Sequence, residues 1–255
     1  MNEHFSIERL WWLLRADFTA GYRSLLTVSA TLAGVILIAS MISFEPGGAA
    51  QGFYVSWYGA MLYIWGVIAS SRAFRELHDK TRNEAYLLIP ASAVEKTVAR
   101  LLTVTIGLAV YLLIFTTVVS LLVEGLFLLL PGSGYGLFNP FDAPLWPLIT
   151  GYFFLQSFYF LGAAWFRRRH FIKTSLVLVL VGIGLALFVM LTLSLVFAPV
   201  DMADLEGLVT RAAGSFQGLF NTLEALRTIF EIVLPLACWT IAWMRVRETQ
   251  VSDGI

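Results

Sequence analysis

The residues that could carry acid–base, redox or metal chemistry are few in this sequence, and they do not cluster. The 255-residue chain contains three histidines, His4, His78 and His170, and a single cysteine, Cys238. Each histidine stands near charged residues outside the apolar runs, which favours a solvated imidazole over a metal ligand or a general base. Cys238 lies inside an apolar run and has no disulfide partner in the chain, so we interpret it as a small buried side chain.

Sequence motifs that hold nucleotides, metals or nucleophiles are absent from the chain. A phosphate-binding loop of the Gly-Lys type cannot form, because no glycine is followed by lysine, and neither HExxH nor GxSxG occurs. No Cys/His cluster has metal-ligand spacing. We therefore expect the chain not to be an enzyme and to hold no cofactor or metal of its own. Its formal net charge of zero gives no reason to expect a nucleic-acid partner.

The composition is that of a membrane protein. Hydrophobic residues make up 58% of the chain and charged residues only 13%, against about 25% charged in soluble domains, and the mean hydropathy is +0.79. Because a spanning helix needs about 20 mostly apolar residues, the sequence predicts an all-α polytopic membrane protein with six transmembrane helices in a single domain, residues 1–255. The predicted spans are residues 25–44, 52–71, 97–123, 145–166, 174–198 and 228–244.

The positions of the basic residues predict how these spans are oriented. All but two of the 17 Lys and Arg residues fall in the N-terminal segment, the second-to-third connection, the fourth-to-fifth connection or the C-terminal tail. The two exceptions are Arg211 and Arg227, which stand among acidic residues. Because basic connections stay in the cytoplasm, the sequence predicts that both ends of the chain are inside.

Two amphipathic segments accompany the spans. In residues 1–24, apolar side chains recur at helical spacing, and the adjacent Trp11 and Trp12 suit the headgroup depth of a membrane. We predict an interfacial helix there; the alternative is a cytoplasmic extension of the first span. In residues 199–227, apolar side chains recur at helical period beside a polar face, which predicts an outer amphipathic segment between the fifth and sixth spans.

The second-to-third connection, residues 72–96, is rich in charges and in helix-start signals. Two capping boxes begin at Thr81 and Ser92, each with a glutamate three residues later. The first predicts a short charged helix over residues 82–88, which Pro90 would end, and the second predicts the start of the third span. Charges of alternating sign are typical of a surface that docks on a protein. The alternative is a solvated loop whose charges only keep it cytoplasmic.

Ionisable groups are scarce at membrane depth in the predicted spans. Ion-coupled transporters usually keep such groups there; Glu231 is the chief candidate, and we interpret it as an acid at the outer interface. Energy for uphill transport would then have to come from outside the chain. The polar side chains left inside the spans include Tyr58 and the candidates to line a pathway, which are Ser56, Tyr63, Gln156, Ser157 and Tyr159.

Residues 74–102, FRELHDKTRNEAYLLIPASAVEKTVARLL, resemble a segment of bacterial permeases of the type-2 ATP-binding-cassette (ABC) transporter family. The resemblance is carried by the charged run after the second span, by the turn LLIPAS at residues 87–92, and by Glu95 and Lys96 at the start of the third span. The layout is similar along most of the chain, with an interface helix, six spans, a cytoplasmic helix after the second span and outer helical elements after the fifth.

This resemblance implies a permease subunit of an ATP-driven exporter, embedded in the lipid bilayer of the bacterial inner membrane. It implies a second permease, identical or paralogous, and two cytoplasmic ABC ATPase subunits that would bind ATP and magnesium. The family's coupling helix corresponds to residues 75–86. Its expected ATPase contacts are Arg75, Glu76, Asp79, Lys80, Arg82, Glu84 and Tyr86. Two other functions stay open: a structural or assembly subunit that moves nothing, and an ion-coupled secondary carrier.

Overall fold

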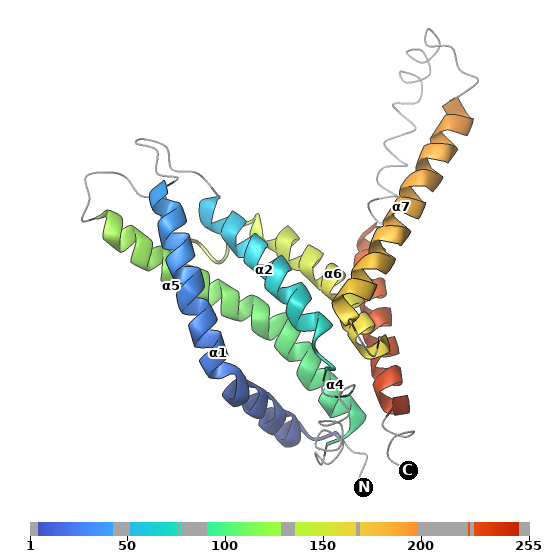
Figure 1. Cartoon of the computed structure of the whole chain (residues 1–255), viewed down its shortest axis with the longest axis horizontal. Coiled ribbons are helices and arrows are strands. Elements are labelled where there is room, and N and C mark those ends of the chain that lie inside the picture. The colour runs from blue at the N-terminus through green and yellow to red at the C-terminus, as the bar shows by residue number, and fades with distance from the viewer. Residues whose placement is uncertain are drawn as a thin grey trace.

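The chain folds into helices. The computed structural model describes residues 5–42, 52–75, 77, 91–128, 136–166, 169–197, 224 and 227–249, and within these ranges it contains no strand, which confirms the all-α prediction (Figure 1). The helices are α1 (Ile7–Ile42), α2 (Phe53–Ser71), α4 (Ala93–Leu102), the π-helical turn η2 (Thr103–Gly107), α5 (Leu108–Phe127), α6 (Leu145–Trp165), α7 (His170–Phe197) and a C-terminal helix (Arg227–Thr249).

Four helical segments in the described part of the chain are long and apolar enough to cross a membrane. A helix of about 20 apolar residues matches the 30 Å thickness of the hydrocarbon core, so these segments indicate a multi-pass membrane protein. They are Gly21–Ile42 within α1, Ala93–Phe127 formed by α4, η2 and α5, His170–Thr192 within α7, and Arg227–Thr249.

The two remaining predicted spans, residues 52–71 and 145–166, coincide with α2 and α6 to within one residue at each end. These helices contain 19 and 21 residues, but tyrosine, tryptophan, serine and glycine make them less apolar than the four segments above. That α2 and α6 also cross the membrane, and with it the count of six spans, stays a prediction.

The helix formed by α4, η2 and α5 begins at the predicted capping box. Ser92 Oγ accepts a hydrogen bond from the Glu95 N–H at 3.2 Å, and Glu95 Oε2 accepts one from the Ser92 N–H at 2.8 Å. The capping box at Ser92 is therefore confirmed. Further along, η2 widens one turn of the helix, and the carbonyl of Val104 within it accepts a hydrogen bond from the Tyr152 hydroxyl of α6.

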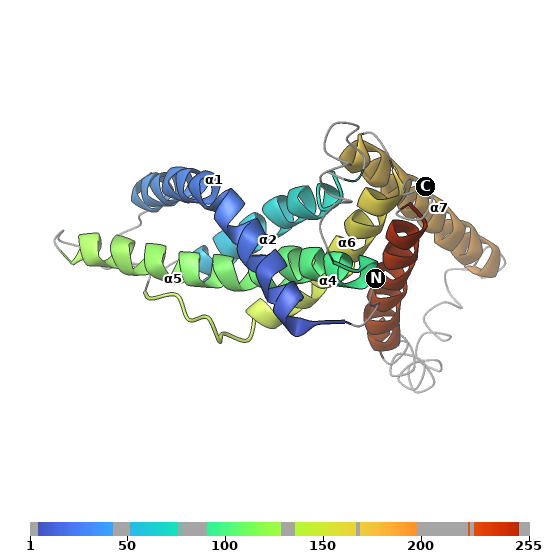
Figure 2. The same ribbon diagram turned by 90° about the horizontal axis from the view of Figure 1, so that it is seen from below.

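The first helix contains both the predicted interfacial segment and the first predicted span. Residues 5–24 of the interfacial segment are described, and from Ile7 onward they form one uninterrupted helix with the rest of α1. This helix changes direction part-way along its length (Figures 1 and 2). Its first turns expose large apolar side chains, among them Trp11, Trp12 and Phe18. Helicity is thus observed, whereas the depth of this part in a membrane stays a prediction.

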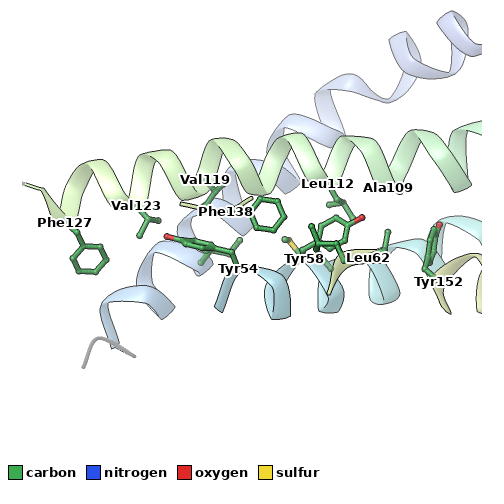
Figure 3. Close-up of a cluster of buried hydrophobic side chains, with 13 residues drawn as sticks. Tyr54, Tyr58, Leu62, Ala109, Leu112, Val119, Val123, Phe127, Phe138 and Tyr152 are labelled. Carbon is green, nitrogen blue, oxygen red and sulfur yellow. The ribbon is translucent and has the colours of Figure 1, made fainter. Parts of the chain in front are cut away.

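Two helices, α2 and α6, approach closely in the main core, which also includes side chains of α1 and α5 (Figure 3). Tyr58, Leu62 and Tyr152 are fully buried there. A Cβ atom at Gly66 of α2 would lie only 2.1 Å from the Tyr152 ring. The absence of a side chain at Gly66 is what allows the Tyr152 ring to lie against the backbone of α2.

A second core cluster joins the ends of α2 and α6 to the C-terminal helix. Phe74, directly after α2, packs edge-on against Phe160 of α6 with 4.9 Å between ring centroids, and Ala163 and Val246 are buried with them. In contrast, α7 diverges from the other helices (Figures 1 and 2), and its large apolar side chains, such as Leu187, are exposed. A surface this apolar is expected to be covered by lipid or by another protein.

We expect Gly66→Ala to destabilise the protein by about 1–3 kcal/mol, because the new methyl group would force the Tyr152 ring out of its packed position. The measurement is the thermal unfolding midpoint of the purified protein in detergent. Gly182→Ala in α7 is the matched control, since nothing lies within 4 Å of a Cβ atom there. Equal midpoints for the two variants would contradict the packing described.

Candidate functional site

The connection between α2 and α4 is fixed to the helix bundle at both of its described ends. After α2 the chain continues in tight turns, in which Arg75 N–H donates to Arg72 O at 3.1 Å and Leu77 N–H donates to Phe74 O at 3.2 Å. Phe74 and Leu77 are buried, and so is Ala91 at the other end. Residues 76 and 78–90 lie outside the described residues. Both described ends of the connection are therefore packed into the protein interior.

The carboxylate of Glu95 links the end of this connection to α1. Glu95 is fully buried, and its Oε1 accepts a hydrogen bond from the Ser6 N–H at 2.7 Å and lies 3.1 Å from Arg9 Nη2. Its Oε2 accepts from the Ser92 N–H at 2.8 Å. A buried carboxylate is costly unless it is hydrogen-bonded and paired with a cation. Glu95 meets both conditions only when the start of α1 lies against the start of α4.

A second ion pair joins the same two helices further along. Arg100 Nη1 of α4 lies 3.2 Å from Asp17 Oδ1 of α1, and both side chains are about one quarter exposed. Arg9 and Asp17 are separated by about 12 Å along the α1 axis, at 1.5 Å per residue. Two separated attachments fix the direction of the first part of α1 relative to α4. We call the set of Ser6, Arg9, Asp17, Ser92, Glu95 and Arg100 the α1–α4 junction.

Sequence reasoning found only part of this junction. The capping box identified Ser92 and Glu95 as a helix start, and the resemblance put Glu95 at the opening of the third span. Neither indicated that Glu95 also binds Ser6 and Arg9, because these contacts join distant parts of the chain, 89 residues apart in the case of Ser6. Opposite charges on two separate amphipathic segments were the only signal, and many other pairings of those charges were equally compatible with it.

Among the predicted ATPase contacts, the structure describes Arg75. Its side chain is exposed in the turns that follow α2, beside the buried Phe74. The other predicted contacts, Glu76, Asp79, Lys80, Arg82, Glu84 and Tyr86, lie outside the described residues. Arg75 is therefore placed where a partner on this side could reach it, and the role of the set stays a prediction.

The side chains predicted to line a pathway are distributed over different contacts. Tyr63 donates a hydrogen bond to Leu148 O at 3.2 Å, Tyr159 is hydrogen-bonded to Ser175 Oγ at 2.9 Å, and Ser157 donates to Phe154 O within its own helix at 2.7 Å. Ser56 is exposed on α2. None of these residues lines either of the two cavities that adjoin α1.

Gln156 differs from these residues because it is polar, fully buried and unsatisfied. Neither its Nε2 nor its Oε1 has a hydrogen-bond partner among the described residues. Buried amides normally have partners. Among the residues predicted to line a pathway, Gln156 is therefore the one whose side-chain amide lacks a hydrogen-bond partner within the described residues.

Comparisons with models of protein families, with curated proteins and with solved structures give no match for this chain. Within the described ranges there is also no group of three or more His, Cys, Asp and Glu side chains that could hold a metal ion. The α1–α4 junction and the anchored connection before it are thus the features from which function can be argued.

We expect Glu95→Gln to lower the free energy of unfolding by about 1–3 kcal/mol, because it removes the charge that compensates Arg9 and leaves a buried amide with surplus donors. Glu248→Gln is the matched control. Its carboxylate pairs with Arg245 at 2.9 Å but is about two thirds exposed, and an exposed pair contributes at most about 1 kcal/mol. Denaturant unfolding in detergent gives both values; a larger loss for Glu248→Gln would contradict the role given to Glu95.

The second ion pair can be tested by exchanging its charges. Asp17→Arg and Arg100→Asp should each weaken the attachment of α1 to α4, which the native pair makes at 3.2 Å. The double variant again places opposite charges at these two positions. A double-mutant cycle on unfolding free energies should give a coupling of about 0.5–1 kcal/mol in favour of the double variant. Strictly additive effects would show that the pair is not an attachment.

Proposed function

We propose that the chain is the permease subunit of an ATP-driven ABC exporter. In this proposal six spans with both ends in the cytoplasm form, with a second permease, the path through the bacterial inner membrane. Two separate ATPase subunits drive the path through residues 75–86. The observation that carries the proposal is the charged connection between α2 and α4, which is anchored at both ends and ion-paired to α1 where it ends.

The α1–α4 junction is suited to pass on a mechanical input. A displacement of the connection reaches α4 through the capping box at Ser92 and reaches α1 through the Glu95 carboxylate, since the same carboxylate binds both helices. Phe74 and Leu77 pass the same displacement to α2 and α6 through the second core cluster. One input would thus move several helices together, as a change between inward- and outward-facing states requires.

The arrangement of the helix ends supports the proposed topology. The start of α1, the end of α2, the start of α4 and the end of the C-terminal helix lie toward the same end of the molecule (Figure 1). An even number of crossings would produce this arrangement. Basic residues lie at this end in the described ranges, among them Arg9, Arg75, Arg100 and Arg245, which agrees with a cytoplasmic location.

The environment of Glu231 favours transport driven by a separate ATPase over transport driven by an ion gradient. Its carboxylate lies 2.7 Å from Arg227 Nε, one turn earlier at the start of the C-terminal helix, and the arginine is largely exposed. This agrees with an acid at the outer interface rather than a proton carrier at membrane depth. Coupling to a separate ATPase therefore needs fewer assumptions than a secondary carrier.

One observation favours a second candidate, a structural or assembly subunit that moves nothing. Three of the polar side chains predicted to line a pathway, Tyr63, Ser157 and Tyr159, are hydrogen-bonded to other groups of the same chain. In the exporter proposal the path lies between two permeases, so the same observation is expected. Transport by the reconstituted complex separates the two functions.

The deciding experiment uses the chain with the ATPase that co-purifies with it, reconstituted into vesicles. Charge reversals Glu76→Lys, Asp79→Lys and Arg82→Glu should each reduce the permease-dependent ATPase rate about tenfold or more, the equivalent of 1.4 kcal/mol in coupling, without reducing insertion. Glu248→Lys, an exposed charge of the C-terminal helix, is the matched control. Stable association with no ATP-dependent movement would favour the structural subunit, and movement under an ion gradient alone would favour the carrier.

The orientation can be tested with membrane-impermeant thiol reagents. In a Cys238→Ala background, Arg82→Cys and Arg168→Cys should be labelled from the same side of the membrane, and Asp142→Cys from the opposite side. Cys238 is buried and is the single native cysteine, so its removal leaves a clean background. Labelling of Arg82→Cys and Arg168→Cys from opposite faces would overturn the six-span topology.

A further inference from the structure

Two adjoining cavities form one groove between α1 and α5. The inner cavity, of about 190 Å³, lies between α1, α2 and α5, and its lining includes Val28, Trp65 and Leu108. The outer cavity, of about 270 Å³, is lined by five side chains of α1, among them Phe18 and Tyr22, and by Tyr111 of α5. Leu25 and Tyr111 line both cavities. We call the combined space the α1–α5 groove.

The groove has an apolar interior. Most of its lining side chains are aliphatic or aromatic. The hydroxyls of Ser29 and Tyr111 are hydrogen-bonded to each other, and Ser29 Oγ also donates to Leu25 O at 2.6 Å. Because these polar groups are already paired, a ligand inside the groove would meet mainly carbon. An extended hydrocarbon chain fits this chemistry.

The length and position of the groove correspond to one leaflet of a bilayer. Its α1 lining runs from Phe18 to Leu32. The part that belongs to the candidate span, from Gly21 to Leu32, is about 17 Å long at 1.5 Å per residue, close to half of a 30 Å hydrocarbon core. Trp11 and Trp12 are exposed in α1, N-terminal to the outer end of the groove at Phe18. Tryptophan side chains favour the headgroup region of a membrane. The groove therefore extends from the headgroup region toward the middle of the membrane.

Positive charge gathers at the outer end of the groove. The guanidinium of Arg23 lies 5.8 Å from the ring centroid of Tyr22, and its Nε donates to the Tyr22 hydroxyl at 3.1 Å. The guanidinium of Arg15 lies 5.5 Å from the ring centroid of Trp12. Both arginines are exposed, so their remaining N–H groups can reach an anion. Arginine with aromatic neighbours is suited to bind phosphate.

We propose that the α1–α5 groove binds an anionic phospholipid of the leaflet on the side of the N-terminus. One acyl chain lies in the groove, and the phosphate headgroup contacts Arg23 and Arg15. The exposed arginines favour this occupant over a second copy of the chain packed through the same face of α1, because such packing would bring like charges together. The proposal depends on the membrane location of α1 but not on export, so a failed transport assay leaves it unaffected.

The test uses the full chain in mild detergent with a photoactivatable phosphatidylglycerol that carries a diazirine on its acyl chain. Crosslinks mapped by mass spectrometry should concentrate on residues 18–32 and on the start of α5. Unlabelled phosphatidylglycerol should compete better than phosphatidylcholine. Arg23→Gln should reduce this preference about fivefold, the effect of one basic residue on an anionic lipid.

Two filling variants and one control complete the experiment. Val28→Trp fills the groove from α1 and Ala69→Leu fills it from α2, and each should suppress the crosslinks to residues 18–32. Val177→Trp in α7, where the side chain is exposed, should leave these crosslinks unchanged. Equal competition by phosphatidylcholine, labelling spread evenly over all exposed helices, full labelling of both filling variants, or a crosslinked pair of chains that protects the groove would each overturn the proposal.

Discussion

The burial of one carboxylate, that of Glu95, determines how the start of α1 and the start of α4 are arranged. An unpaired charge in this position would be strongly destabilising, so the folded state has to bring Ser6, Arg9 and Ser92 to the same point. The carboxylate also lies at the N-terminal end of α4, where the helix dipole favours negative charge. A single group thereby sets the start of one helix and the position of another.

The apolar exterior of the chain is the second constraint. Large apolar side chains of α1, α7 and the C-terminal helix are exposed, and a surface of this kind is expected to be covered by lipid or by another protein. Within lipid the hydrophobic effect no longer holds helices together, and close packing with a few polar contacts takes its place. The approach of α2 and α6 at Gly66 and the hydrogen bond from Tyr63 to Leu148 O are contacts of this kind.

The sequence predicted the features that depend on local pattern. Helices formed at all six predicted spans, because long runs of apolar residues with few charges and few helix breakers favour a helix. The capping box at Ser92 was readable from two residue types at fixed spacing. The contacts of Glu95 with α1 and of Arg100 with Asp17 were not predicted, since each depends on how two distant helices approach. The exposure of Ser56 and the isolation of Gln156 likewise depend on helix rotation, which weak periodicity in the spans leaves undetermined.

The wide turn η2 changes how the side-chain faces of the 35-residue helix Ala93–Phe127 are aligned. One additional residue in a turn rotates everything beyond it by about 100° relative to an unbroken α-helix. The residues of α5 are consequently rotated by this angle from the positions that an unbroken continuation of α4 would give them. The helical register changes at η2, and the Tyr152 hydroxyl of α6 donates a hydrogen bond to Val104 O within this turn. Residues that uninterrupted helical spacing would place on one face of this helix therefore point to different neighbours on the two sides of η2.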